Sequence, residues 1–244
     1  METILAELHI LGKLAVFDDI LHGSDCWDAY QHGRYLPGDI VVMFSMDRAQ
    51  LYKNKASDCW IYIWILVNLA PNKCYKKRYM MPRAIIPGPN KPKNIDLFMY
   101  PGLHHVAALQ KEGFQVWDVS RRATNPSHPW IILVTADAVG ASLLYRGVSH
   151  HGKKGCCKGC NKVGHRKPGG SHYYSACLKP DNYNEDGCNH SDDEPANLPV
   201  WSPEEYQDDC IQLQQSASIA KYEHRCLKTG ISRPSIFSGM PSEC

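Results

Sequence analysis

Runs of apolar residues along the chain predict that residues 36–140 form a mixed α/β domain. Stretches of aliphatic, β-branched and aromatic residues, separated by segments rich in Pro, Gly and Lys, are typical of strands. The expected strands are 39–46, 60–69, 78–86, 114–117 and the apolar run that ends at Ala136. Pro82 restricts its strand to a sheet edge or a bulge, because proline has no N–H to donate. The tryptophans of these strands are expected in the core: Trp60, Trp64, Trp117 and Trp130.

Three other segments have the apolar spacing of amphipathic helices. The first occupies most of 4–17, and the second runs from the cap residue Asn94 to Gly113. The third is expected as a single helix over 202–230, with Ser202 as the cap and Pro203 at the first helical position.

Two of the expected strands are followed directly by an aspartate, Asp47 and Asp137. Such a carboxylate either caps the following turn, before Arg48 and before Gly140, or is a metal ligand at the end of a strand. The order strand, strand, strand, helix, strand, strand is that of a ribonuclease-H-like sheet, in which the first strand and the strand after the helix are neighbours. That order brings two carboxylates together, as magnesium sites require.

Charge and cysteine content change the picture after residue 140. The net charge of the chain is only +2, but seven Lys or Arg and no acid lie between Arg146 and His172, whereas six acids and no base lie between Asp181 and Glu194. The 11 cysteines, together with an N-terminus unlike a signal peptide, favour a reducing compartment, and we expect a cytosolic or nuclear protein. No segment has the length and apolar character of a membrane span.

The cysteines suggest a metal site. Cys157 and Cys160 are separated by two residues, which allows both thiolates to bind one tetrahedral zinc ion. The remaining ligands are left open by the spacing, and free thiols in a loop are the alternative. The nearby candidates are Cys156, His165, His172, Cys188 and His190.

Four stretches together resemble one protein family. They are "LPGDIVVMFSMDRAQLYKNKASDCWIYIWILVNLAP", "RAIIPGPNKPKNIDLFMYPGLHHVAALQKEG", "WIILVTADAVGASLLYRG" and "HHGKKGCCKGCNK". Their order and spacing resemble the transposases of CACTA-type (En/Spm-like) DNA elements, and in particular the fungal branch. The resemblance covers about Leu36 to Tyr174, and the "IPGPNKPKNIDLF" segment is its most specific part.

The resemblance implies a nuclear enzyme that cuts and joins DNA at transposon ends. A ribonuclease-H-like core would hold Mg or Mn with two aspartates and a third acid, and the first two acids correspond to Asp47 and Asp137. It also implies a structural zinc ion bound by Cys157, Cys160 and His172, and we take Cys188 as the fourth ligand among Cys188, His190 and His165. The resemblance is compatible with a homo-oligomer.

The third acid has no clear counterpart. In the family it lies well beyond the zinc insertion, whereas the acids available here lie on one amphipathic helix, where charges are usually solvated. They are Glu204, Glu205, Asp208, Asp209 and Glu223. We therefore expect a partial or truncated copy with an incomplete active site. The alternative is a non-catalytic, zinc-dependent DNA-binding remnant of a transposable element.

These expectations divide the chain into four parts. Residues 1–35 form an N-terminal helix and connector, and 36–140 form the first part of the ribonuclease-H-like core. Residues 141–200 form a Cys/His-rich basic insertion with an acidic loop, and 201–244 form a C-terminal helix and tail. Phosphate contacts are expected from the basic residues of the insertion: Lys153, Lys154, Lys158, Lys162, Arg166 and Lys167.

Overall fold

The computed structural model divides into two compact units, which are Met1–Ala136 with Met240–Cys244, and Asp137–Gly239. It describes residues 4, 6–7, 10, 16–17, 19–50, 53, 58–88, 92–119, 121–155, 160–184, 186–188, 190–199 and 202–240. The helix expected over 4–17 therefore lies mostly outside the described residues.

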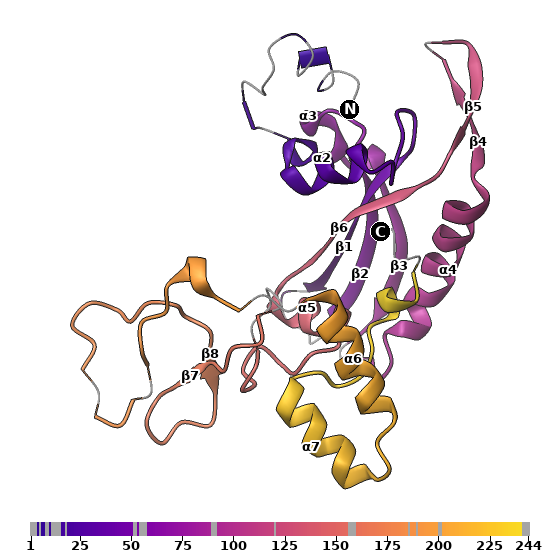
Figure 1. Ribbon diagram of the computed structural model, residues 1–244. Helices are drawn as coiled ribbons and strands as arrows, with labels where there is room; N and C mark the ends of the chain where they lie inside the picture. The colour runs from indigo at the N-terminus through magenta and orange to yellow at the C-terminus, as the bar shows by residue number, and fades with distance from the viewer. Residues whose placement is uncertain are drawn as a thin grey trace. The chain divides into compact units, whose positions relative to one another are not determined.

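The first unit is built on a mixed sheet of four strands in the order β3-β2-β1-β6 (Figure 1). β1 (Val41–Gln50) lies between β2 (Asp58–Leu66), its antiparallel partner, and β6 (Trp130–Ala136), its parallel partner. β3 (Met80–Pro87) pairs antiparallel with β2 at the edge. The α/β class and the mixed sheet predicted from the sequence are confirmed.

The strand boundaries differ from the prediction, most clearly at the ends of β1 and β2. β1 does not end before Asp47 but continues to Gln50. Its backbone still pairs with β2 as far as Gln50 opposite Asp58, although the side chains from Asp47 onward are no longer buried. β2 ends at Leu66 rather than residue 69, and Pro71 begins the short helix α3 (Pro71–Cys74). Ladder hydrogen bonds use the backbone, so a change from apolar to polar side chains does not mark the end of a strand.

The prediction for Pro82 is confirmed. The register of β3 against β2 shifts between Tyr62, which faces Ala84, and Ile63, which faces Pro82. The shift leaves Arg83 as the extra residue of a bulge. Proline is tolerated here because β3 is the edge strand of the sheet.

Helix α4 (Asp96–Glu112) lies along one face of the sheet (Figure 1). Phe44 of β1 is fully buried between the rings of Tyr62 and Trp64, at centroid distances of 5.4 and 5.2 Å. The Tyr62 hydroxyl donates a hydrogen bond of 3.0 Å to the carbonyl oxygen of Phe98 on α4. Alternate residues of β1 therefore face α4, as the period of two requires.

The opposite face of the sheet is covered by η1 (Ile20–His22), α2 (Ser24–Gln31) and α3. Val41 and Met43 of β1 pack there in one cluster with Tyr35 and Trp130, whose rings are stacked at 4.7 Å. β1 is thus buried on both faces, which makes it the centre of the first unit.

Between α4 and β6 the chain forms a separate hairpin from β4 (Phe114–Asp118) and β5 (Ala123–Ser127). The strand expected at 114–117 is confirmed, whereas β5 was missed because Asn125 and Pro126 are poor strand formers. Trp60, Trp64 and Trp130 are buried as expected, but Trp117 is 59% exposed, and its placement in the core was wrong. The hairpin is not part of the four-stranded sheet.

The second unit begins with α5 (Ala138–Leu144) and contains the hairpin of β7 (His165–Arg166) and β8 (Tyr173–Tyr174), then η3 (Pro195–Asn197). The single helix expected over 202–230 is two helices, α6 (Pro203–Gln214) and α7 (Ile219–Thr229), followed by η4 (Ile236–Gly239). The side chain of Ser218 accepts a hydrogen bond from the Lys221 N–H and caps α7. The serines of the segment 215–218 therefore favour a turn between the two helices.

Replacing Phe44 by Ala should destabilise the protein by about 3–5 kcal/mol, because it leaves a cavity between two aromatic rings in a site that cannot collapse easily. Urea unfolding followed by circular dichroism measures the loss. Leu133→Ala on β6, at a side chain that is 41% exposed, is the control and should cost less than about 1 kcal/mol. Equal losses in both variants would contradict the assignment of the core.

Candidate functional site

Asp47 lies on the solvent-exposed half of β1. It follows the buried Met46 and is paired with Ile61 of β2. Its Oδ1 accepts a hydrogen bond of 2.7 Å from the N–H of Arg48. None of the described residues donates a hydrogen bond to its Oδ2. The carboxylate is therefore held at one oxygen by the backbone, with the other oxygen available to a ligand.

Asp137 follows the last residue of β6 and is the N-cap of α5. Its Oδ1 accepts a hydrogen bond of 2.6 Å from the N–H of Gly140, which is the capping role that the sequence left open as an alternative. A cap of this kind uses one carboxylate oxygen. Capping therefore fixes the side chain but leaves Oδ2 for a second partner.

The register between β1 and β6 aligns the positions that precede the two aspartates. Val42 pairs with Ile131, Met43 pairs with Leu133, and the last pair is Met46 with Ala136. The shift between the first two pairs leaves Ile132 as an extra residue on β6. Without this shift, Met46 would pair with Thr135 instead of Ala136. A slip of one residue reverses the face to which side chains point, so the bulge sets which residue of β6 pairs with Met46, the residue before Asp47.

The acids of the C-terminal helices are mostly on exposed surface. Glu204 and Glu205 lie in the first turn of α6, and the Glu205 carboxylate accepts a hydrogen bond of 3.2 Å from the N–H of Ser202 in a capping box. Glu205 therefore has a structural role, and no contact of Asp208, Asp209 or Glu223 singles out one of them as a third acid.

The Cys/His-rich segment contains several of the predicted zinc ligands, although Cys157 lies outside the described residues. Cys160 and Cys188 are half-buried, and His172 is exposed, with its ring 4.9 Å from that of His151. Within the part of the chain that the structure describes, no group of three or more His, Cys, Asp or Glu side chains is placed to hold a metal ion. The zinc site stays a prediction.

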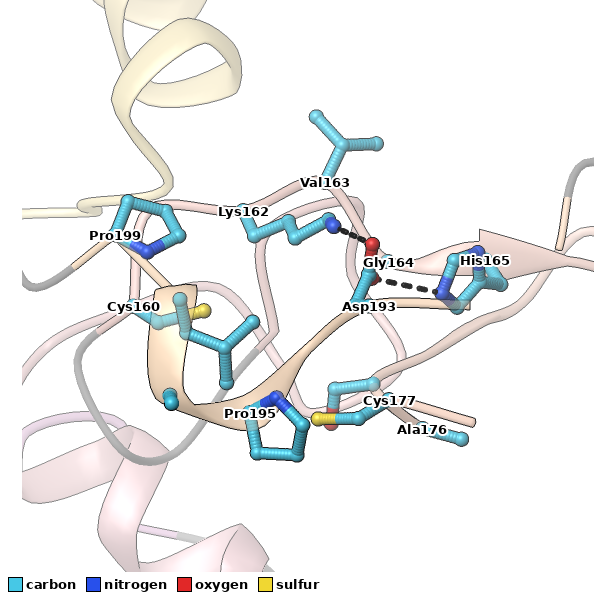
Figure 2. Close-up of a pocket in the computed structure, with 13 residues that line it drawn as sticks. Cys160, Lys162, Val163, Gly164, His165, Ala176, Cys177, Asp193, Pro195 and Pro199 are labelled. Atoms are coloured by element: carbon cyan, nitrogen blue, oxygen red, sulfur yellow. Dashed lines mark ion pairs between the residues drawn. The ribbon is translucent and has the colours of Figure 1, made fainter. Parts of the chain in front are cut away.

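A buried polar network in this segment was not predicted (Figure 2). Asp193 pairs with Lys162 and with His165, whose Nε2 is 3.3 Å from Oδ2 of Asp193. The His165 ring is stacked on that of His190 at 4.0 Å, and His190 Nδ1 is 3.1 Å from the hydroxyl of Tyr174. His165 was considered only as a metal ligand, and Asp193 only as part of an acidic loop. Sequence spacing offered no signal that would have joined them.

Two pKa shifts follow from this network. The hydrogen bond from Lys162 lowers the pKa of the Asp193 carboxyl, and the positive charge of the same lysine acts in the same direction. Burial lowers the pKa of His190, and the neighbouring His165 lowers it further. His190 is therefore neutral at pH 7, and its buried Nε2 has no hydrogen-bond partner among the described residues.

The network borders a pocket of about 460 Å³ lined by both polar and apolar side chains. Figure 2 shows the thiols of Cys160 and Cys177 on different sides of this pocket, which Pro195 of η3 and Pro199 also line. The β7–β8 hairpin contributes His165. The insertion thus has a formed interior even though it contains few large apolar residues.

The predicted DNA-binding residues of the insertion differ in their surroundings. Lys153, Arg166 and Lys167 are exposed, whereas Lys162 is paired with Asp193 and Lys158 lies outside the described residues. Lys154 donates a hydrogen bond of 2.6 Å to Asn161, and burial lowers its pKa. The exposed residues are thus better placed to contact phosphates than Lys154 and Lys162.

No helix among the described residues is long and apolar enough to cross a membrane.

The chain matches the family model described as transposase family tnp2 over residues 38–169, more than half of its 244 residues. The match includes the whole four-stranded sheet, Asp47, Asp137 and the Cys157–Cys160 pair. No curated protein and no solved structure matches the chain. Because the match covers more than half of the chain, the chain belongs to the tnp2 family of transposases.

Proposed function

We propose that this transposase-family chain carries the metal-binding half of a DDE-type site on a ribonuclease-H-like core, as in CACTA-type elements of the fungal branch. The observation that supports the proposal most directly is the parallel register of β1 and β6, which ends at Met46 and Ala136 immediately before Asp47 and Asp137. The substrate would be DNA at transposon ends, and the site of action the nucleus.

The strand order supports the ribonuclease-H-like assignment. Three antiparallel strands are followed by helix α4, and the strand that then joins the sheet runs parallel to the first one. The β4–β5 hairpin is an addition between the helix and that strand. Fold alone does not establish chemistry, so the aspartates carry the functional part of the proposal.

Asp47 and Asp137 fit a magnesium or manganese site. Carboxylate oxygens are the ligands that these ions prefer, and each aspartate has one oxygen fixed by a backbone N–H and one without a hydrogen bond in the described structure. Two bound ions would stabilise the attacking and leaving oxygens of a phosphodiester. The two backbone hydrogen bonds hold the carboxylates in place before an ion arrives, which reduces the ordering cost of binding.

The third acid of the site is unassigned. Glu205 is engaged in the capping box of α6, and we therefore place it last among the candidates. The use of Asp137 as a helix cap supports the second candidate function, a non-catalytic, zinc-dependent DNA-binding protein, because capping alone would account for this aspartate.

A structural zinc ion is also proposed for the insertion. Zinc takes four nitrogen or sulfur ligands in a tetrahedron, and Cys157, Cys160 and Cys188 are retained as thiolate ligands. For the histidine, the buried Nε2 of His190, which has no hydrogen-bond partner in the described chain, favours His190 over the exposed His172. The ion would hold together a segment that has few large apolar residues of its own.

Substituting Asp47 or Asp137 by Asn should abolish metal-dependent nicking of supercoiled DNA. We expect the full chain to nick DNA with Mn²⁺ or Mg²⁺, and each variant to lose about a hundredfold or more in rate, because an amide binds these ions far more weakly than a carboxylate. The assay follows conversion of supercoiled to open-circular DNA with and without EDTA.

The matched control for this assay is Glu112→Gln, at an exposed acid at the end of α4, which should nick at the rate of the unaltered protein. Nicking that survives both Asp variants would refute the proposed site. Salt-sensitive DNA binding without any nicking would instead support the second candidate function.

The purified protein should contain about one zinc ion per chain. Cys160→Ser and His190→Asn should each lower the zinc content and the thermal stability of the second unit, since structural zinc stabilises the folded state. Cys226→Ser on α7 and His172→Asn are the matched controls. Mass spectrometry under native conditions measures the content, and zinc loss in His172→Asn with retention in His190→Asn would reverse the choice of histidine.

A further inference from the structure

The β4–β5 hairpin is the part of the first unit whose role the fold does not explain. It leaves the chain between α4 and β6, contributes no strand to the four-stranded sheet, and its strands contact mainly each other. In Figure 1 the hairpin stands apart from the sheet and extends beyond the end of α4. A projecting arm of this kind costs conformational entropy without adding to the core.

One face of the hairpin exposes large apolar side chains. Trp117 is directly opposite Thr124, and the next pair on this face is Gln115 with Pro126. Trp117 is 59% exposed and Val119, beyond the end of β4, is 76% exposed. A single indole with one valine beside it is too small for a stable protein interface, which buries about 800 Å² on each partner. A flat aromatic ring in this position is suited to a smaller, flat ligand group.

The tip of the hairpin adds positive charge. Arg121 and Arg122 are both exposed, and Asp118 is the one acid of the described hairpin residues. Arg121 lies 3.8 Å from Asp118 in a solvent-exposed ion pair, which contributes little and is readily exchanged for another anion. Arg122 has a left-handed backbone conformation, with φ of 49°, a strained arrangement for a residue with a side chain. The charge favours an anionic partner.

We propose that this hairpin is a DNA-contacting arm, in which Trp117 stacks on an unpaired base while Arg121 and Arg122 neutralise neighbouring phosphates. The inference rests on the proposed function, because it takes DNA as the partner. Aromatic side chains stack on any base whose face is open, and arginines bind phosphates without reading sequence. In an intact duplex the faces of the bases are covered by their neighbours, so the arm would distinguish opened or nicked DNA from closed duplex.

Equilibrium binding by fluorescence anisotropy tests the arm. The full chain is titrated onto a blunt duplex and onto the same duplex with a short single-stranded gap, with Ca²⁺ in place of Mg²⁺ to prevent cleavage. Trp117→Ala should weaken binding to gapped DNA about tenfold and to blunt duplex less than twofold, whereas Trp117→Phe should keep most of the affinity. The double variant Arg121→Gln/Arg122→Gln should reduce the slope of log K against log salt by about 1.4 to 1.8.

Matched controls come from the same unit. Tyr75→Ala removes an aromatic side chain that is 58% exposed after α3, and Arg34→Gln removes an exposed arginine after α2. Tyr75→Ala should leave the preference for gapped DNA unchanged, and Arg34→Gln should leave the salt slope unchanged. Because Trp117 is exposed, its variants should unfold at the same temperature as the unaltered protein.

Three results would overturn the inference. If Trp117→Ala and the unaltered chain bind gapped DNA with equal affinity, Trp117 does not stack on a base. A change of oligomeric state in Trp117→Ala, measured by analytical ultracentrifugation, would assign the hairpin to self-association. A chain that binds neither DNA would refute the proposed function as well, whereas DNA binding unaffected by the hairpin variants would refute the arm alone.

Discussion

The parallel pairing of β1 with β6 is the constraint on which the rest of the first unit depends. β1 is buried on both faces and supplies side chains to α4 on one side and to α2 and α3 on the other. The pairing joins residues about 90 positions apart in the chain, and the extra Ile132 adjusts its register so that it ends at Met46 and Ala136. The sheet therefore pairs the two residues that precede Asp47 and Asp137 in the chain.

The second unit is stabilised in a different way. Its insertion has few large apolar side chains, and its interior is organised by the stacked rings of His165 and His190 and by the charges of Asp193 and Lys162. Buried polar groups are costly unless they are partnered, which makes the one unpartnered nitrogen of His190 informative.

Much of the first unit could be predicted from local sequence. The β-branched and aromatic runs identified the strands, and Pro82 correctly indicated an edge strand with a bulge. Local pattern failed where backbone pairing continued without apolar side chains, as in β1 beyond Asp47, and where pairing used poor strand formers, as in β5. The break between α6 and α7 depends on one capping serine within an otherwise continuous amphipathic pattern.

Local sequence pattern singled out some residues of the candidate site and missed others. The two aspartates were proposed because each directly follows an apolar run, and their metal-binding role stays a prediction. The register that aligns the residues before them depends on a bulge that no local pattern indicates. The network joins His165 to His190 and Asp193, which lie on a segment well beyond it in sequence, so it became visible only with the fold.

The most direct test of the central claim is Mn²⁺ binding measured by calorimetry on the unaltered chain, Asp47→Asn, Asp137→Asn and the double variant. If both carboxylates bind the same ions, either single substitution removes most of the affinity, and the double variant loses little more than either single one. Independent losses that add, or unchanged affinity in either single variant, would show that Asp47 and Asp137 do not form one site.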